Sequence, residues 1–228
     1  MLAMWGEILL IAGAYLLGSA PHLAALGKLR GISLEGDMHI NLWRKGGRLI
    51  GLAGILLELA KGAIPVLAGK ALHYDTLIVT LAGLAVVMGQ MWPVFSRFNG
   101  EKGNSIGAGM AAALAIKPLL IAIIPFAIGA GIKTLPRLFI KRQSLNEWTK
   151  FGGPPSISLP LGMGTGFLVL PIASWGFGAP AAVTAGFAVL FILIIIRRVT
   201  AGLSVDLKDK TNVSGIILNR ILYDRSYR

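Results

Sequence analysis

Long apolar stretches separated by short polar segments dominate this chain. Seven such stretches run approximately over residues 5–26, 49–72, 76–95, 106–116, 119–133, 156–175 and 180–196. Most of them approach the roughly 20 apolar residues that a helix needs to cross the hydrocarbon core of a bilayer, and a shorter one suits a broken helix inside a protein-lined cavity. The pattern therefore predicts an all-α integral membrane protein with about seven transmembrane helices.

The basic residues decide between six and seven spans. Only Lys117 and Pro118 separate residues 106–116 from residues 119–133, so these two stretches could also form one long span. With seven spans and the N-terminus outside, all of the 22 lysines and arginines lie on the cytoplasmic side except Lys61, Lys70 and Lys117. Six spans would place the basic cluster of residues 133–150 outside, against the positive-inside rule. We therefore expect seven spans and a cytoplasmic C-terminus.

Composition supports a membrane protein and limits its chemistry. The 228-residue chain is 55% hydrophobic and only 14% charged, which is too apolar for a soluble domain. A net charge of +12 could indicate binding to nucleic acid. In a membrane protein, however, such a charge usually reflects basic cytoplasmic loops beside anionic lipid, so no nucleic-acid partner is predicted. The absence of cysteine excludes disulfides and thiolate chemistry. The first stretch lacks a basic leader and a cleavage site, so it is predicted to be a retained span.

The chain divides into a membrane part and a basic tail. We expect residues 1–196 to form the polytopic domain, with a basic cytoplasmic loop over residues 134–155, and residues 197–228 to form a cytoplasmic tail. Apolar residues at helical spacing in residues 216–223 predict a short helix lying on the membrane surface. The chain shows no convincing internal repeat, which argues against a transporter built from two related halves.

A glycine-rich stretch carries the strongest chemical signal. Residues 100–109 contain four glycines around Lys102, just before an apolar segment. Glycines let the backbone approach a ligand closely, and the amides at a helix N-terminus favour an anion, so a phosphate cradle is one interpretation. The stretch lacks the spacing of a nucleotide-binding P-loop. The other interpretation is that the glycines pack helices and that Lys102 only follows the positive-inside rule.

Two opposite charges lie inside the second span. Glu58 and Lys61 are three residues apart, so a helix places them on one face. Charges at this depth are costly and usually face a polar cavity. They could form a structural pair, or they could lie beside a substrate site.

Other polar residues gather at the cytoplasmic ends of the spans. Ser19 follows a glycine where Pro21 breaks the first span, and it could bind phosphate or bond a freed carbonyl. Asn41 and Arg44 belong to a polar, glycine-containing segment before the second span, and Ser156 begins the sixth, where it could cap the helix or bind a ligand.

The three histidines do not suggest a metal centre. His22, His39 and His73 have no spacing that would build a metal site, so no metal and no cofactor are predicted.

Several of these segments resemble motifs of one enzyme family. Residues 18–21, Gly-Ser-Ala-Pro, are similar to that family's Gly-Ser-x-Pro, residues 41–47 resemble the end of its first cytoplasmic motif, and residues 58–67 are similar to its Asp-x-x-Lys-Gly segment. Residues 89–109 are the most specific match, because they resemble its phosphate-binding motif Gly-His-x-Phe-Pro-Val-Phe…Phe-x-Gly-Gly-Lys-Gly. The family is the bacterial acyl-phosphate:glycerol-3-phosphate acyltransferases of the PlsY type.

The resemblance implies a reaction in phospholipid synthesis. A fatty acyl group would move from acyl phosphate to the 1-hydroxyl of glycerol 3-phosphate and give lysophosphatidic acid. The family has seven spans, an outside N-terminus and an active site at the cytoplasmic face of the bacterial cell membrane, which agrees with the topology inferred from charge. Membrane lipid is then the third partner.

The resemblance also assigns roles to residues. Lys102 and nearby amides would bind one phosphate, while Arg44 and Lys61 would hold charge on the other. Ser156 matches the family's serine after the basic loop, and together with Arg198 it is predicted to be catalytic. The expected substrate- and phosphate-binding residues are Ser19, Asn41, Arg44, Glu58, Lys61, Gly100, Lys102 and Gly103.

The chain departs from the family in four features. Its first cytoplasmic motif is shorter, Gln90 replaces a histidine, and Glu101 replaces a glycine before Lys102. The family's Arg-His-x-x-Asn at the last span is here residues 197–201, Arg-Arg-Val-Thr-Ala, and residues 219–220, Asn-Arg, could supply a displaced equivalent. These departures favour an alternative, a non-catalytic relative that binds a lipid precursor or a partner enzyme. The retained Lys102 and Lys61 favour the enzyme.

Overall fold

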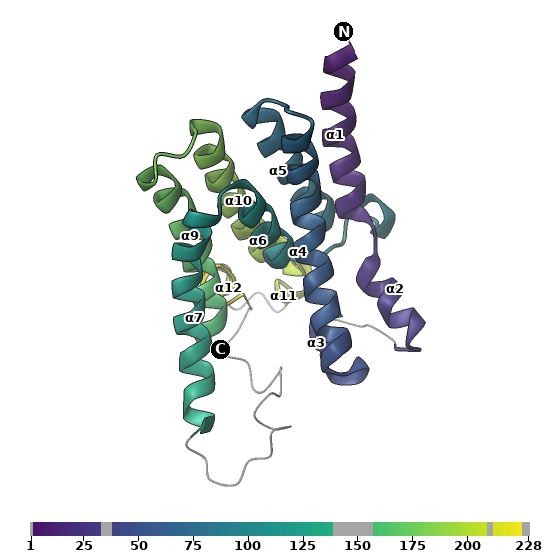
Figure 1. Cartoon of the computed structure of the whole chain (residues 1–228). Coiled ribbons are helices and arrows are strands. Elements are labelled where there is room, and N and C mark those ends of the chain that lie inside the picture. The colour runs from purple at the N-terminus through teal and green to yellow at the C-terminus, as the bar shows by residue number, and fades with distance from the viewer. Residues whose placement is uncertain (1, 33–37, 139–156, 209–211, 225–228) are drawn as a thin grey trace.

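The chain folds into a bundle of helices. The computed structural model describes residues 2–32, 38–138, 157–208 and 212–224, and it shows helices and no strand within these ranges (Figure 1). The elements are α1 Leu2–Ser19, α2 His22–Leu29, α3 Met38–Gly46, α4 Arg48–Ala71, α5 Thr76–Met91, the 3₁₀ turn η1 Val94–Ser96, α6 Asn104–Leu114, α7 Ile116–Leu138, α9 Ser158–Gly176, α10 Ala181–Thr200, α11 Leu203–Asp206 and α12 Val213–Tyr223. The N-terminus lies at one end of the bundle, and α2 and α3 lie at the other (Figure 1).

Six helical segments in the described ranges are long and apolar enough to cross a membrane. They are Met4–Leu29, Arg48–Ala71, Thr76–Ser96, Ile116–Lys133, Ser158–Gly176 and Ala181–Asp206. Large apolar side chains stay exposed along them, for example Leu57, Ile124 and Ile172, as expected of surfaces that face lipid. The predicted fourth span, residues 106–116, corresponds to α6, whose 11 residues extend over only about 16 Å. The number of spans and their orientation remain predictions.

The break between α6 and α7 lies earlier than the sequence suggested. Ala115 is extended and α7 begins at Ile116, so Lys117 and Pro118 belong to the first turn of α7. Proline is tolerated there because the first amides of a helix have no intrahelical acceptor. Lys70 of α4 stabilises the end of α6, since its Nζ donates to the carbonyls of Ala113 (2.6 Å) and Leu114 (3.1 Å).

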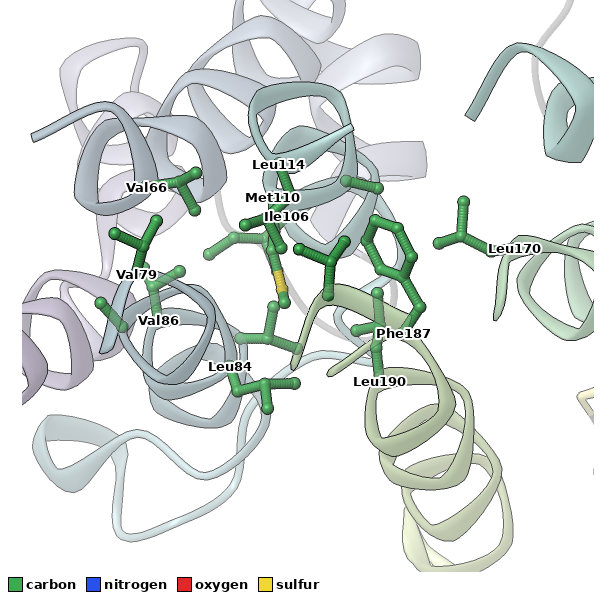
Figure 2. Packing of buried hydrophobic residues seen from close by; sticks show 14 of the residues in the cluster. Val66, Val79, Leu84, Val86, Ile106, Met110, Leu114, Leu170, Phe187 and Leu190 are labelled. Atoms are coloured by element: carbon green, nitrogen blue, oxygen red, sulfur yellow. The ribbon is translucent and has the colours of Figure 1, made fainter. Parts of the chain in front are cut away.

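The apolar core lies where α4, α5, α6 and α10 meet. Figure 2 shows Val66, Val86, Met110 and Phe187 pointing into one cluster, and each of these side chains is fully buried. Three of these four helices carry the polar groups of the candidate site, so the core fixes the distances between those groups.

Glycines allow α4 and α6 to approach closely. A side chain on Gly62 would overlap the carbonyl oxygen of Ile106, and one on Gly109 would overlap that of Leu59. Small residues at such crossings are typical of membrane helices, where packing takes the place of hydrophobic pairing. The helix-packing interpretation of the glycines after Lys102 therefore holds for Gly109.

The tail helix is part of the bundle. The apolar spacing of residues 216–223 predicted a short helix, and the structure forms it as α12. It packs against α9 and α10, and its Arg220 is buried. A position at the membrane surface remains a prediction, and so does the division at residue 196, which falls within α10. Most of the predicted loop, residues 139–155, lies outside the described residues.

Candidate functional site

A buried polar network joins α4 and α5. Lys61 Nζ donates to Gln90 Oε1 at 3.2 Å, and Gln90 Nε2 donates to Glu58 Oε1. Only 6% of Lys61 and 1% of Glu58 are exposed, so both charges lie inside the protein. Gln90, which stands where the family has histidine, thus bridges the two charged groups.

The break after α1 brings two more polar groups to Lys61. Pro21 stops the helix, and in the resulting turn the carbonyl of Ala20 accepts from His22 N at 2.9 Å and from Lys61 Nζ at 2.9 Å. The same ammonium lies 3.1 Å from His22 Nδ1, and His22 Nε2 lies 3.9 Å from Glu58 Oε1. Because three polar partners surround the Lys61 ammonium, its charge is stabilised at a depth where an isolated ammonium would be costly.

Ser19 is held at the contact between α1 and α5. Its Oγ lies 3.0 Å from the carbonyl oxygen of Tyr15 and 3.3 Å from that of Gly89, so it is placed to donate to both. Of its two predicted interpretations, this geometry matches the satisfaction of backbone carbonyls. Tyr15 adds a second link, because its hydroxyl donates to the carbonyl of Trp92 at 2.7 Å.

A cavity of about 110 Å³ opens beside this network. Lys61 and Gln90 form one part of its wall, the α1–α2 break forms another, and the turn after η1 forms a third. Its lining includes Ser19, His22, Lys61, Gln90, Asn99, Gly100 and Glu101. Three of the predicted substrate-binding residues, Ser19, Lys61 and Gly100, therefore line a single cavity.

Residues 99–103 form a tight turn against the end of α5. Glu101 N donates to the carbonyl of Gln90 at 3.1 Å, and a side chain on Gly100 would overlap that carbonyl oxygen. Gly103 has φ 77°, in the left-handed region that glycine adopts without strain, and it directly precedes α6. Gly100 and Gly103 are thus required by the turn that carries Lys102.

Arg197 of α10 also holds this turn in place. Its guanidinium donates to the carbonyls of Glu101 (3.3 Å) and Gly100, and to Asn99 Oδ1 (3.4 Å). The group lies over the ring of Trp92, with Cζ 6.0 Å from the ring centroid, which suits a cation–π contact. Arg197 therefore joins the last long helix to the predicted phosphate turn.

Arg198 and Lys102 both contact the C-terminal part of the chain, Ile221 of α12 and Asp224 after it. Lys102 Nζ pairs with Asp224 Oδ2 at 2.6 Å, and neither residue is part of the cavity lining. Arg198 is 2% exposed and donates to the carbonyls of Ile221 (3.3 Å) and Pro160 (3.1 Å). It thereby connects α10 to α12 and α9, and its predicted catalytic role remains a prediction.

Of the three remaining predicted residues, the structure describes the backbone of two. Asn41 and Arg44 belong to α3, but their side chains are outside what the structure describes, and Ser156 lies outside the described residues altogether. No group of three histidine, aspartate or glutamate side chains that could hold a metal ion occurs in the part of the chain that is described.

Four groups in this region were not assigned to the site from the sequence. His22 had been considered only as a metal ligand, and Gln90 only as a departure from the family motif. Arg197 and Asp224 had no assigned role. The position of His22 directly after the proline break was the one local signal, since such a break exposes backbone carbonyls and draws polar side chains.

The fold and the site together define a class of protein. It is a polytopic helical membrane protein in which a buried acid–amide–lysine network adjoins a cavity and a glycine-bounded turn that carries Lys102 and is contacted by Arg197. The family model described as glycerol-3-phosphate acyltransferase matches residues 8–142, more than half of the chain. The chain belongs to this family, as its motifs predicted.

Named relatives support the assignment. Glycerol-3-phosphate acyltransferase 4 of Dehalococcoides mccartyi is 30% identical over 227 residues, which cover 97% of this chain and 90% of that relative. The glycerol-3-phosphate acyltransferase of Geobacter metallireducens is 43% identical over 120 residues, and the match covers half of this chain and 62% of the relative. Both names are those of enzymes, so they do not favour the non-catalytic alternative.

Solved structures agree over nearly the whole length. A crystal structure of PlsY (YgiH), described as an integral membrane glycerol 3-phosphate acyltransferase in its lysophosphatidic acid form, matches with a TM-score of 0.67 and 27% identity, covering 90% of this chain and 93% of that one. The glycerol 3-phosphate form matches with a TM-score of 0.66 and 26% identity, covering 98% and 95%. The predicted class, an all-α integral membrane protein, is confirmed.

Proposed function

We propose that this protein transfers a fatty acyl group from acyl phosphate to glycerol 3-phosphate and so produces lysophosphatidic acid. The observation that carries the proposal is the cavity between the Lys61 network and the turn of residues 99–103, both within the residues that match the family model. Such a cavity, buried among membrane helices, can admit a small polar acceptor where an acyl donor is also soluble.

The reaction needs positioning more than strong acid or base. The hydroxyl oxygen of the acceptor attacks the acyl carbonyl carbon, the bond from that carbon to the phosphate oxygen breaks, and phosphate leaves with the electron pair. The hydroxyl proton passes to an oxygen of the departing phosphate. Since the acyl group is already activated, holding two anions and stabilising the developing oxyanion are the main tasks left to the protein.

The residues divide these tasks between two places. Lys61 supplies a positive charge at the cavity wall, where the carbonyl of Ala20 and Gln90 hold it in position. Lys102 supplies a second one at the start of α6, where free backbone amides add to the attraction for phosphate. Arg44, Ser156 and Arg198 keep the roles that the resemblance implies.

We further propose the bacterial cell membrane as the location, with the active site at the cytoplasmic face. The concentration of basic residues on one side supports this orientation, because positively charged loops are retained on the cytoplasmic side.

The proposal is tested by acyl transfer with the purified full-length chain in lipid. Labelled glycerol 3-phosphate is supplied with acyl phosphate in one reaction and with acyl coenzyme A in another. We expect lysophosphatidic acid from acyl phosphate, and a strong loss of product in the Lys102→Ala variant at unchanged folding. Lack of product from either donor with a folded sample would refute the proposal, and product from acyl coenzyme A alone would correct the donor.

A further inference from the structure

The tail places its own carboxylate on the predicted phosphate lysine. Asp224, the residue that follows α12, lies 122 positions from Lys102 along the chain, yet its Oδ2 is 2.6 Å from Lys102 Nζ. The lysine side chain is 39% exposed and the aspartate side chain 15%. An anion of this protein thus occupies the position where a substrate phosphate would be attracted.

The contact is set by the way α12 ends and is anchored. Asp224 has φ 57°, a left-handed conformation that aspartate tolerates better than most residues, and its amide donates to the carbonyl of Arg220 at 3.1 Å. Arg220 in turn pairs with Asp206 and donates to carbonyls at the end of α10. Because Arg220 anchors α12 to α10 and Asp206, α12 holds the carboxylate of Asp224 in a defined position.

One oxygen of the carboxylate and one donor of a nearby arginine remain without hydrogen bonds. Asp224 Oδ1 is buried and has no hydrogen-bond partner among the described residues, and the same is true of Arg198 Nε. Arg198 is also near enough to Asp224 for their charges to interact. A phosphate has more oxygens and more charge than a carboxylate, so it can satisfy donors that a single aspartate leaves unused.

We propose that Asp224 is a specificity-determining residue that sets the affinity of the Lys102 site for phosphate by competing with the substrate for this lysine. The identity of the substrate rests on the proposed function, whereas the competition itself concerns any phosphate. A bound carboxylate must move or share the ammonium before a phosphate can bind, and its negative charge repels the dianion. Neutralising Asp224 therefore strengthens phosphate binding.

The first test measures binding without any chemistry. The full-length protein in lipid nanodiscs is titrated with inorganic phosphate and, separately, with glycerol 3-phosphate at fixed ionic strength. Asp224→Asn keeps the shape and suits the left-handed conformation, and Asp224→Gly provides a second variant that also accepts φ 57°. Asp75→Asn is the matched control, because it removes one exposed carboxylate at the N-cap of α5 and keeps a capping side chain.

We expect both Asp224 variants to bind phosphate roughly two- to fivefold more tightly than the parent, the range expected for loss of one partly exposed ion pair, and Asp75→Asn to bind like the parent. The gain should vanish when Lys102→Ala is added. Equal binding by Asp224→Asn and Asp75→Asn would overturn the proposal. Weaker binding would also overturn it, because Asp224 would then be holding Lys102 in position for the ligand.

Acyl transfer by the same variants separates this inference from the proposed function. Tighter phosphate binding in Asp224→Asn, with no transfer by any variant, would support the competition and refute the acyltransferase. Transfer by the parent, with unchanged binding in Asp224→Asn, would support the acyltransferase and refute the competition.

Discussion

The guanidinium of Arg220 pairs with the carboxylate of Asp206 and at the same time caps the end of α10. Arg220 Nε lies 2.9 Å from Asp206 Oδ2, and Nη1 donates to the carbonyls of Arg198 (3.3 Å) and Val199 (3.2 Å). One side chain of α12 thus neutralises an acid and satisfies carbonyls that a helix end leaves without donors. The tail helix and the last long helix are consequently one structural unit.

Replacement of Arg220 should loosen this unit. Arg220→Met removes the donors and leaves buried carbonyls unsatisfied, at a cost of about 1–3 kcal/mol. Arg220→Lys keeps the charge, but a single ammonium cannot reproduce the planar fork, so we expect only partial recovery. Thermal unfolding and limited proteolysis of the tail provide the measurement. Parent-like values for Arg220→Met would show that the cap contributes nothing.

The network of Glu58 and Lys61 gives a prediction about stability. Lys61→Met leaves the carboxylate of Glu58 buried without its cation, and breaking a buried pair in this way costs about 3–5 kcal/mol. The double variant Glu58→Gln with Lys61→Met removes both charges and should recover much of the lost stability. The measurement is thermal unfolding of the single and double variants in one detergent. If the double variant is less stable than Lys61→Met, the two charges are not coupled.

The predicted role of Lys102 concerns binding and not folding. Its side chain is 39% exposed, so Lys102→Ala should leave the melting temperature nearly unchanged. Loss of a charged hydrogen bond to phosphate, worth about 1.5–3 kcal/mol, should weaken glycerol 3-phosphate binding by about 10- to 100-fold. Lys102→Arg retains the charge and should lose less. Unchanged affinity in Lys102→Ala would remove the phosphate-cradle interpretation.

The close crossing of α4 and α6 predicts a sharp response to a single methyl group. Gly62→Ala inserts a carbon where the carbonyl oxygen of Ile106 lies, and such overpacking costs about 1–3 kcal/mol. Gly13→Ala in α1 is the matched control, because nothing lies within 4 Å of the added carbon and alanine favours a helix. We expect a lower melting temperature for Gly62→Ala only. Equal melting temperatures would mean that the helices move apart at little cost.

Sequence reasoning predicted what depends on local spacing. The apolar stretches predicted the long helices, the proline at residue 21 predicted the break in the first span, and the three-residue spacing of Glu58 and Lys61 placed both on one face. Each of these follows from neighbouring residues and the geometry of a helix.

The rest depends on contacts between distant elements. Arg197 and Arg198 are neighbours in sequence, but a helix directs adjacent side chains about 100° apart, and only packing decides which one faces a given partner. The resemblance assigned Arg198 to the reaction, whereas Arg197 contacts the turn that is predicted to bind phosphate. No spacing rule could pair Lys102 with Asp224, because the contact depends on how α12 folds back onto α10.

The shortness of α6 places its first turn beside the middle of α4. Lys70 holds the end of α6 level with the end of α4, but α6 is less than half as long, so its start lies near the middle of α4, at the height of Glu58 and Lys61. Under the proposed function, a water-soluble acceptor would have to leave the aqueous phase to reach Lys61, whereas an acyl donor dissolved in the bilayer would reach the same depth by lateral diffusion. The short α6 would thus place the proposed reaction at a depth that the acyl donor reaches without leaving the lipid.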